Sequence, residues 1–227
     1  MPIERNNPIV CYVTRRESLK GAEPGRALAE KIRMAIAAGV DWVQIREKDL
    51  PGRELVSLAR EAVAMARQAS QEEPARLARI IVNDRLDVAV AAGAAGVHLG
   101  GASLPMREVS EWRRTANAPR DFLVGVSCHG LGEAREAEAG GADYIFFGPV
   151  FETPEKLAFG APQGLEKLGE ACRAVKIPVL AIGGANIENA EGCLRAGAAG
   201  IAAIRMFQEA RDEKELREIV TRVRGVV

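Results

Sequence analysis

The sequence predicts an α/β fold, a single (β/α)8 barrel of the TIM type that takes up residues 1–227 as one domain. Eight short apolar runs rich in β-branched residues alternate with longer stretches of Ala, Leu, Glu and Arg, as in strands and helices of parallel sheets. The length of 227 residues is close to that of one barrel. The segment AGAAG occurs at 92–96 and, 104 positions later, at 196–200, a separation of about four of eight units.

Strands are expected at eight short apolar runs. They are 9–14, 42–46, 80–83, 96–99, 123–127, 144–148, 179–182 and 200–203. Amphipathic helices fit between them: in the segment 26–38, Leu28, Ile32 and Ile36 share one face, and the charged Lys31 lies off it. Strand followed by helix, repeated along the chain, implies parallel pairing through right-handed crossovers.

The positions of glycines support the barrel. Gly93 and Gly197, inside the repeated segment, are expected to end helices in the left-handed conformation. Gly39 and Gly140 occupy equivalent positions before the strands that begin at Trp42 and Tyr144. The competing architecture, a doubly wound open sheet, would carry a G-x-G-x-x-G turn after its first strand. The chain has Arg15 and two further charged residues there, so the barrel is favoured.

Composition limits the classes of partner. The 31 basic and 31 acidic residues balance, which argues against nucleic acid or an anionic membrane as partner. No uncharged run of about 18 residues occurs, so neither a signal peptide nor a membrane span is expected. The four cysteines form no C-x-x-C pair, and free thiols in a cytoplasmic protein are the expectation. A homo-oligomer is left open.

Polar residues at the end of the second predicted strand suit an anion. Ligands of β/α barrels bind at the carboxyl ends of the strands. Alternation puts Gln44 and Arg46 on one face, and Lys48 continues that side into the loop. Two cations and an amide at one point suit a pyrophosphate. The alternative is a surface ion-pair cluster with Glu47 and Asp49.

The third and fifth strands end in further polar residues. Asn83 and Asp84 could cap a helix, but a carboxylate and an amide beside a pyrophosphate are also how a protein holds Mg²⁺, and we favour Mg²⁺ for Asp84. His129, after the fifth strand, could be an acid or base or could pack in a loop. His98 lies inside an apolar strand and is expected to be a hydrogen-bonded core histidine.

The later loops extend the first anion site and add a second one. Thr153 and Lys156 lie in a Pro- and Gly-rich stretch after the sixth strand and are candidate phosphate ligands of the first, pyrophosphate site. Gly184 follows the seventh strand and Arg205 the eighth, where barrels commonly bind phosphate. A pyrophosphate site with a metal and a separate monophosphate site suit an enzyme that joins two phosphorylated small molecules.

These strand ends resemble the thiamine phosphate synthase family. The matching segments are VQIREKD (43–49), VNDRLDVAVAAGAAGVHLG (82–100), VGVSCH (124–129), GADYIFFGPVFETPEK (141–156) and PVLAIGG (178–184). The resemblance implies a barrel that joins hydroxymethylpyrimidine pyrophosphate to thiazole phosphate, with Mg²⁺, and releases pyrophosphate.

The resemblance also implies roles for individual residues. Those that would hold the pyrimidine pyrophosphate are Gln44, Arg46, Lys48, Asn83, Ser127 and Lys156. Asp84 would bind Mg²⁺. Those that would take the thiazole phosphate are Thr153, Gly184, Ile204 and Arg205. The catalytic residues among them would be Arg46, Lys48, Lys156 and Ser127.

The chain departs from the family pattern at three points. Ser103 stands where the family has a second magnesium carboxylate, Arg205 follows Ile204 where Val-Ser is usual, and Glu155 replaces a small polar residue. Two alternatives therefore stay open. One is the related thiazole tautomerase, in which His129 would be the acid/base; the other is a barrel that binds a thiamine precursor without catalysis.

Overall fold

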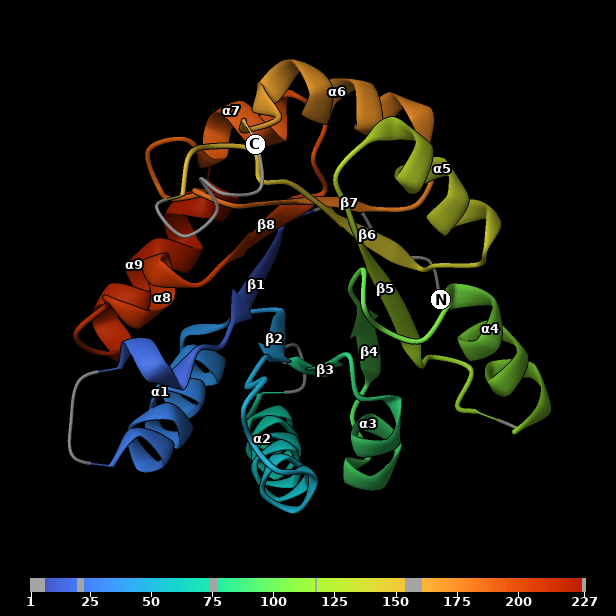
Figure 1. The fold of residues 1–227 in the computed structure, drawn as a ribbon. Helices are drawn as coiled ribbons and strands as arrows, with labels where there is room; N and C mark the ends of the chain where they lie inside the picture. Colours follow the sequence, from blue (N-terminus) through green and yellow to red (C-terminus); the bar gives the residue numbers. More distant parts are fainter. Residues whose placement is uncertain (1–6, 20–22, 74–76, 117, 154–160, 226–227) are drawn as a thin grey trace.

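The computed structural model describes residues 7–19, 23–73, 77–116, 118–153 and 161–225, which form a closed barrel of eight parallel strands surrounded by helices (Figure 1). Each strand pairs with the next in chain order, and the last strand pairs with the first. The predicted fold class is therefore confirmed.

All eight predicted strands form, and each agrees with the expected bounds to within one residue. They are β1 (Ile9–Val13), β2 (Trp42–Ile45), β3 (Arg79–Asn83), β4 (Gly96–Leu99), β5 (Leu123–Cys128), β6 (Tyr144–Phe147), β7 (Val179–Ile182) and β8 (Gly200–Ala203). Their short lengths and parallel register leave the carboxyl ends of all eight at one end of the barrel.

A helix follows every strand. The helices are η1 (Arg16–Ser18), α1 (Pro24–Ala38), α2 (Gly52–Glu72), α3 (Leu86–Ala92), α4 (Met106–Thr115), α5 (Leu131–Ala139), α6 (Gly164–Ala174), α7 (Ala190–Arg195), α8 (Arg205–Gln208) and α9 (Glu213–Arg224). The expectation for Lys31 was wrong, because this residue of α1 is buried. Its ammonium donates a hydrogen bond to the carbonyl of Ala210, which compensates for the burial.

Alternation along the strands separates two apolar layers. The inward-facing side chains fill the barrel: Ile9, Cys11, Val13, Trp42, Ile81, Leu123, Tyr144, Phe146, Leu180 and Ala202. Trp42 of β2 and Tyr144 of β6 meet across the interior with ring centroids 4.6 Å apart. The outward-facing side chains pack against the helices in a larger core. Because the interior is filled, a ligand can bind only at an end of the barrel.

The repeated AGAAG segment begins two strands that lie four positions apart around the barrel. A Cβ on Gly96, at the start of β4, would lie 2.3 Å from the carbonyl oxygen of Leu123 in the neighbouring strand. A Cβ on Gly200, at the start of β8, would lie 2.2 Å from the carbonyl oxygen of Ile9. The repeat therefore reflects the same close approach of neighbouring strands, which only glycine allows.

Three of the four glycines expected to end helices have left-handed backbones. The φ angles are 93° at Gly39, 66° at Gly93 and 106° at Gly197. Gly140 was predicted wrongly: its φ is −74°, because it still continues the helical conformation of α5, and Gly141, with a φ of 92°, makes the turn.

The structure bears on the predictions about membrane spans and thiols for the residues that it describes. Within them, no helix is long and apolar enough to cross a membrane. All four cysteines are free. Burial raises the pKa of the Cys128 and Cys193 thiols to about 12, so neither is a reactive thiolate near neutral pH.

Candidate active site

Polar side chains continue the inner face of four neighbouring strands above the apolar interior. Gln44 lies two residues after Trp42 on β2, and Asn83 lies two residues after Ile81 on β3. His98 on β4 and Ser127 on β5 face the same way. The structure therefore brings polar groups together at the carboxyl ends of β2 to β5, the end of the barrel that we call the mouth.

A hydrogen-bonded row joins the predicted residues of β2 and β3. The Gln44 amide donates to the Asn83 side-chain oxygen at 3.0 Å, and the Asn83 amide donates to the Asp84 carboxylate at 2.6 Å. Gln44 is buried, and Asn83 and Asp84 are half-buried. Asn83 therefore links the buried amide to the carboxylate, and neither Asn83 nor Asp84 serves as a side-chain cap of α3.

Asp84 is held in an uncommon backbone conformation. Its φ is 61°, the only positive value at a non-glycine residue in the described part of the chain. The amide of Arg85 donates to the carbonyl of Asn83 at 2.7 Å, which closes a three-residue turn around Asp84. Strained residues of this kind are concentrated at functional sites. The turn directs the Asp84 carboxylate back toward Asn83 and the loop that follows β4.

Ser103 lies beside Asp84, as its place in the family pattern implied. Its hydroxyl donates a hydrogen bond to the Asp84 carboxylate and accepts one from the amide of Gly100 at 2.7 Å. The loop after β4 therefore supplies a neutral hydroxyl at the point where a second carboxylate would stand next to Asp84.

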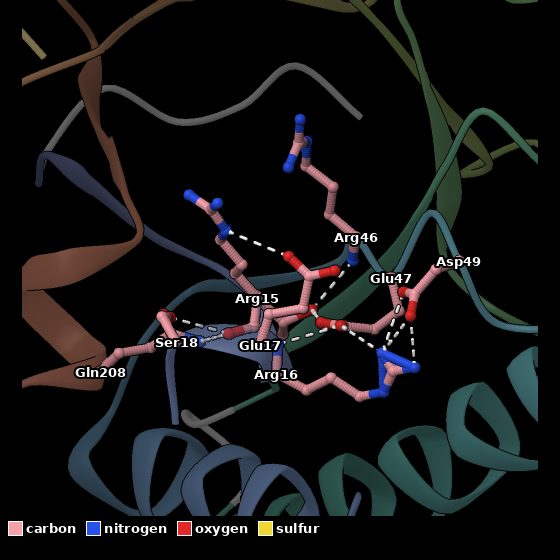
Figure 2. Close-up of polar contacts among 9 residues, drawn as sticks. Arg15, Arg16, Glu17, Ser18, Arg46, Glu47, Asp49 and Gln208 are labelled. Carbon is pink, nitrogen blue, oxygen red and sulfur yellow. Dashed lines mark hydrogen bonds and ion pairs between the residues drawn. The ribbon is translucent and has the colours of Figure 1, made fainter. Parts of the chain in front are cut away.

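The cations of the second strand end are separated from their acidic neighbours. Among the described residues, the Arg46 guanidinium and the Lys48 ammonium form no hydrogen bond or ion pair. Asp49 pairs instead with Arg16, whose guanidinium donates to both carboxylate oxygens at 2.5–2.9 Å. Figure 2 shows the Arg46 guanidinium directed away from Glu47, Asp49 and Arg16. The expected alternative, an ion-pair cluster of Arg46 or Lys48 with these two acids, does not form.

Glu47 has a structural role that the sequence did not reveal. Its buried carboxylate accepts hydrogen bonds from the Thr14 hydroxyl at 2.6 Å and from the Arg16 amide at 2.9 Å. The Thr14 oxygen in turn accepts from the Arg46 amide at 2.9 Å. Burial raises the pKa of Glu47, and these hydrogen bonds oppose the rise. The only signal in the sequence was that Glu47 alternates with Arg46 and so points to the other face.

His98 is the buried, hydrogen-bonded histidine that the sequence predicted. Its Nε2 lies 2.9 Å from the Ser127 hydroxyl and its Nδ1 lies 3.2 Å from the Tyr144 hydroxyl. Burial lowers the pKa of His98 to about 3, with a smaller contribution from the nearby charge of Arg46, so the imidazole is neutral at pH 7. Tyr144 was not predicted as part of the site.

His129 is exposed at the end of β5 and is held by its own loop. Its Nδ1 lies within hydrogen-bond distance of the Gly148 carbonyl oxygen, and its amide donates to the Glu133 carboxylate at 2.6 Å. Since a carbonyl can only accept, Nδ1 carries a proton in this contact. These contacts give His129 a role in packing its loop.

The loops after β6 and β7 lie against each other. A Cβ on Gly184 would lie 2.7 Å from the Phe151 side chain, and the Phe151 amide donates to the Gly183 carbonyl at 2.9 Å. The segment that leads to Thr153 therefore lies against the Gly183–Gly184 turn. Two residues after Phe151, the Thr153 hydroxyl is shielded from solvent and has no hydrogen-bond partner among the described residues. A buried hydroxyl without a partner is costly unless a ligand satisfies it.

The other predicted residues of the second anion site are less constrained. Ile204 precedes α8, and Arg205 is exposed, its guanidinium unpaired with any described residue. Lys156, which is predicted for the pyrophosphate site, and Glu155 lie outside the described residues. Of the residues predicted to bind the thiazole phosphate, the structure describes Thr153, Gly184, Ile204 and Arg205.

The side chains around Asp84 offer few ligands for Mg²⁺. No group of three or more His, Cys, Asp or Glu side chains that could hold a metal occurs in the described residues. Asp84 supplies one carboxylate, with the Ser103 hydroxyl beside it. Mg²⁺ is commonly bound by one or two carboxylates together with substrate phosphates and water. The residues therefore fit an Mg²⁺ that arrives with a pyrophosphate, and they do not form a complete metal site alone.

Comparisons with known proteins agree with this geometry. Residues 10–207 match the family model described as thiamine monophosphate synthase. A thiamine-phosphate synthase of Moorella thermoacetica is 43% identical over 205 residues, which cover 88% of this chain and 92% of that protein. One of a Roseiflexus species is 38% identical over 204 residues, covering 90% and 80%. The structure of a thiamine phosphate pyrophosphorylase from Pyrococcus furiosus superposes with a TM-score of 0.78 at 35% identity, covering 96% and 98%.

Proposed function

The chain belongs to the thiamine monophosphate synthase family, and its activity is the synthesis of thiamine phosphate; from this premise we propose how its residues carry out that reaction. The reaction joins hydroxymethylpyrimidine pyrophosphate to thiazole phosphate and releases pyrophosphate. One observation carries the assignment of residues: the row of Gln44, Asn83 and Asp84 begins two residues before Arg46, and no described acid pairs with Arg46 or Lys48.

The pyrophosphate of the pyrimidine substrate binds at the ends of β2 and β3. The Arg46 guanidinium and the Lys48 ammonium bind its oxygens, and Lys156 adds a third cation. Gln44 and Asn83 donate hydrogen bonds to the substrate once their mutual contact opens. The pyrimidine ring lies over the barrel interior, against Ser127. Arginine suits this task because its planar fork binds two oxygens at once.

The leaving group departs before the new bond forms. The bond between the pyrimidine methylene carbon and the pyrophosphate oxygen breaks, both electrons leave with the oxygen, and the thiazole nitrogen then donates a lone pair to the carbon. Arg46, Lys48 and Lys156 stabilise the negative charge that develops on the leaving oxygen, which is commonly the largest catalytic contribution. Mg²⁺, held by Asp84 with Ser103 beside it, would neutralise further charge on the pyrophosphate.

The thiazole phosphate binds on the opposite side of the mouth. The Thr153 hydroxyl and the backbone of Gly184 bind the phosphate, and the backbone of Ile204 and the side chain of Arg205 complete its site. The unsatisfied hydroxyl of Thr153 supports this assignment. Arg205 supplies a charge that a Val-Ser pair lacks, so we expect it to strengthen phosphate binding.

The cysteines bear on the cellular compartment in which the reaction takes place. We propose that the chain acts in the cytoplasm on phosphorylated small molecules, since its four cysteines are free thiols. Its oligomeric state can be measured by light scattering of the purified protein.

The function is tested by incubating purified protein with both phosphorylated substrates and Mg²⁺, followed by mass spectrometry. Thiamine phosphate and pyrophosphate are expected in equal amounts. A parallel reaction with the thiazole carboxylate phosphate alone tests the tautomerase alternative. Tight binding of the pyrimidine pyrophosphate in calorimetry, without release of pyrophosphate when thiazole phosphate is added, would identify a binding protein without catalysis.

Substitution of either free cation tests the assignment of residues. Arg46→Ala and Lys48→Ala are expected to lower kcat by roughly a hundredfold or more, because each removes charge stabilisation from the transition state. Arg222→Ala, which changes an exposed arginine in the last turn of α9, is the matched control and is expected to leave kcat unchanged. Full activity in both active-site variants would remove the pyrophosphate assignment.

A further inference from the structure

Three polar side chains form a continuous hydrogen-bond network beneath the mouth. The Tyr144 hydroxyl lies 3.2 Å from His98 Nδ1, and His98 Nε2 lies 2.9 Å from the Ser127 hydroxyl. The imidazole also packs on Phe146, with ring centroids 4.2 Å apart. Tyr144 and His98 are fully buried, whereas Ser127 is partly exposed at the mouth. The network therefore runs from the barrel interior to the Ser127 hydroxyl, which is accessible from the mouth.

Gly125 makes this arrangement possible. It pairs in register with His98 on one side and with Tyr144 on the other. A Cβ at this position would lie 2.1 Å from Tyr144 Cζ and 2.4 Å from its hydroxyl oxygen. The tyrosine ring thus lies over the bare glycine backbone, where its hydroxyl reaches the imidazole of the strand beyond. Any larger residue at position 125 would displace it.

The positions of the protons follow from the requirement that buried donors find acceptors. No carboxylate in the described part of the chain contacts the His98 ring, so the buried imidazole carries one proton. If that proton were on Nδ1, it would point at the Tyr144 oxygen, and the phenolic hydrogen would have no acceptor among the described residues. If it is on Nε2, Tyr144 donates to Nδ1 and Nε2–H donates to Ser127. Only the second arrangement satisfies every buried donor.

The second arrangement determines what Ser127 offers to a ligand. Because its oxygen accepts from Nε2–H, the hydroxyl hydrogen of Ser127 is free to point into the mouth. We propose that Tyr144 and His98 are positioning residues that hold Ser127 as a hydrogen-bond donor to an acceptor nitrogen of the substrate's pyrimidine ring. An amino group of the ring would need the opposite polarity. The contact orients the ring so that its methylene carbon lies toward Arg46.

The identity of the ligand rests on the proposed function. The tautomer of His98, by contrast, can be measured in the protein without any ligand. The chain has only two histidines, so ¹⁵N-labelled imidazoles are resolved readily by NMR, and His129→Gln assigns the signals. Protonated Nε2 and unprotonated Nδ1 are expected for His98 at pH 7. Protonated Nδ1 would overturn the proposal, and this result would not depend on whether the protein makes thiamine phosphate.

A variant connects the tautomer with binding. Tyr144→Phe keeps the ring and removes the donor to Nδ1, so His98 is expected to populate both tautomers. The dissociation constant for hydroxymethylpyrimidine pyrophosphate is then expected to rise by roughly tenfold, the effect of one misdirected hydrogen bond. Inorganic pyrophosphate, which does not reach Ser127, is expected to bind as it does to the wild type.

Two outcomes in calorimetry would count against the proposal. Unchanged binding of the pyrimidine pyrophosphate to Tyr144→Phe would show that the hydroxyl does not direct Ser127. An equal loss of affinity for inorganic pyrophosphate would show general damage to the mouth. If the variant does not fold, the tautomer of wild-type His98 and the affinity of Ser127→Ala for the two ligands decide the matter: the proposal requires loss for the pyrimidine ligand alone.

Discussion

Single side chains set the electrostatics of the mouth. Among the described residues, Asp84 is the one carboxylate placed to hold a metal there, and its neighbour across the hydrogen bond is the neutral Ser103. Asp49 pairs with Arg16, so no acid in the described ranges pairs with Arg46 or Lys48. These two cations and one carboxylate suit a negatively charged ligand.

Ser103→Asp is expected to strengthen Mg²⁺ binding. The new carboxylate would lie beside Asp84, and two carboxylates that repel each other without a metal bind one more tightly. A gain of roughly tenfold in affinity, about 1.4 kcal/mol, is expected in a calorimetric titration of Mg²⁺ with inorganic pyrophosphate present. Ser103→Asn, which adds similar bulk without charge, should show no gain. A weaker site in the aspartate variant would remove Ser103 from the surroundings of the metal.

At the scale of elements, the ends of β1 and β2 are joined by the buried Glu47. Through Thr14 its carboxylate reaches the backbone of Arg46, and through the Arg16 amide it holds the start of η1 (Figure 2). The position of Arg46, which we propose to be catalytic, thus depends on a carboxylate that points to the other face of its strand.

Glu47→Ala is expected to lower the free energy of unfolding by about 1–3 kcal/mol, because the Thr14 hydroxyl and the Arg16 amide lose a buried acceptor. The KM for the pyrimidine pyrophosphate should rise as well. Asp49→Ala is the control: its side chain is 48% exposed, against 2% for Glu47, and exposed pairs contribute less than about 1 kcal/mol. Equal effects in urea unfolding of the two variants would contradict the role given to Glu47.

The glycines at the strand starts are a second property of the elements. Gly200→Ala is expected to destabilise the barrel by roughly 1–3 kcal/mol, because its Cβ would overlap the Ile9 carbonyl oxygen and push β1 and β8 apart. Gly132→Ala in α5 meets nothing within 4 Å and should instead stabilise the helix by about 0.5–1 kcal/mol. Thermal unfolding of the two variants should therefore show shifts of opposite sign.

The whole molecule should be sensitive to acid through His98. Its folded-state pKa, about 3, is below the ordinary value of 6.5, so between these values the unfolded chain binds the extra proton. The contribution of neutral His98 to the stability of the folded state is therefore complete above pH 6.5, and it is lost as the pH falls toward 3. With a chelator present, the free energy of unfolding of wild type minus that of His98→Gln should fall by up to about 1.4 kcal/mol per pH unit. A pH-independent difference would show that His98 titrates normally.

The sequence by itself determined the barrel and the strand ends that line its mouth. The two-residue period of the strands and the longer helical stretches are local properties, so eight strands could be predicted to within one residue. The same alternation brought Gln44 and Asn83 to one face, and the structure joins them. Residues whose position depends only on their own strand were predictable.

Contacts between side chains of different strands were decided by closure of the barrel. The partners of Glu47, Ser103 and His98 lie 33, 19 and 46 positions away along the chain, at Thr14, Asp84 and Tyr144. The burial of Lys31 likewise depends on the Ala210 carbonyl, 179 positions away. Which side chains of different strands meet is set by the register and twist of the closed sheet, and neither has a local signal in the sequence.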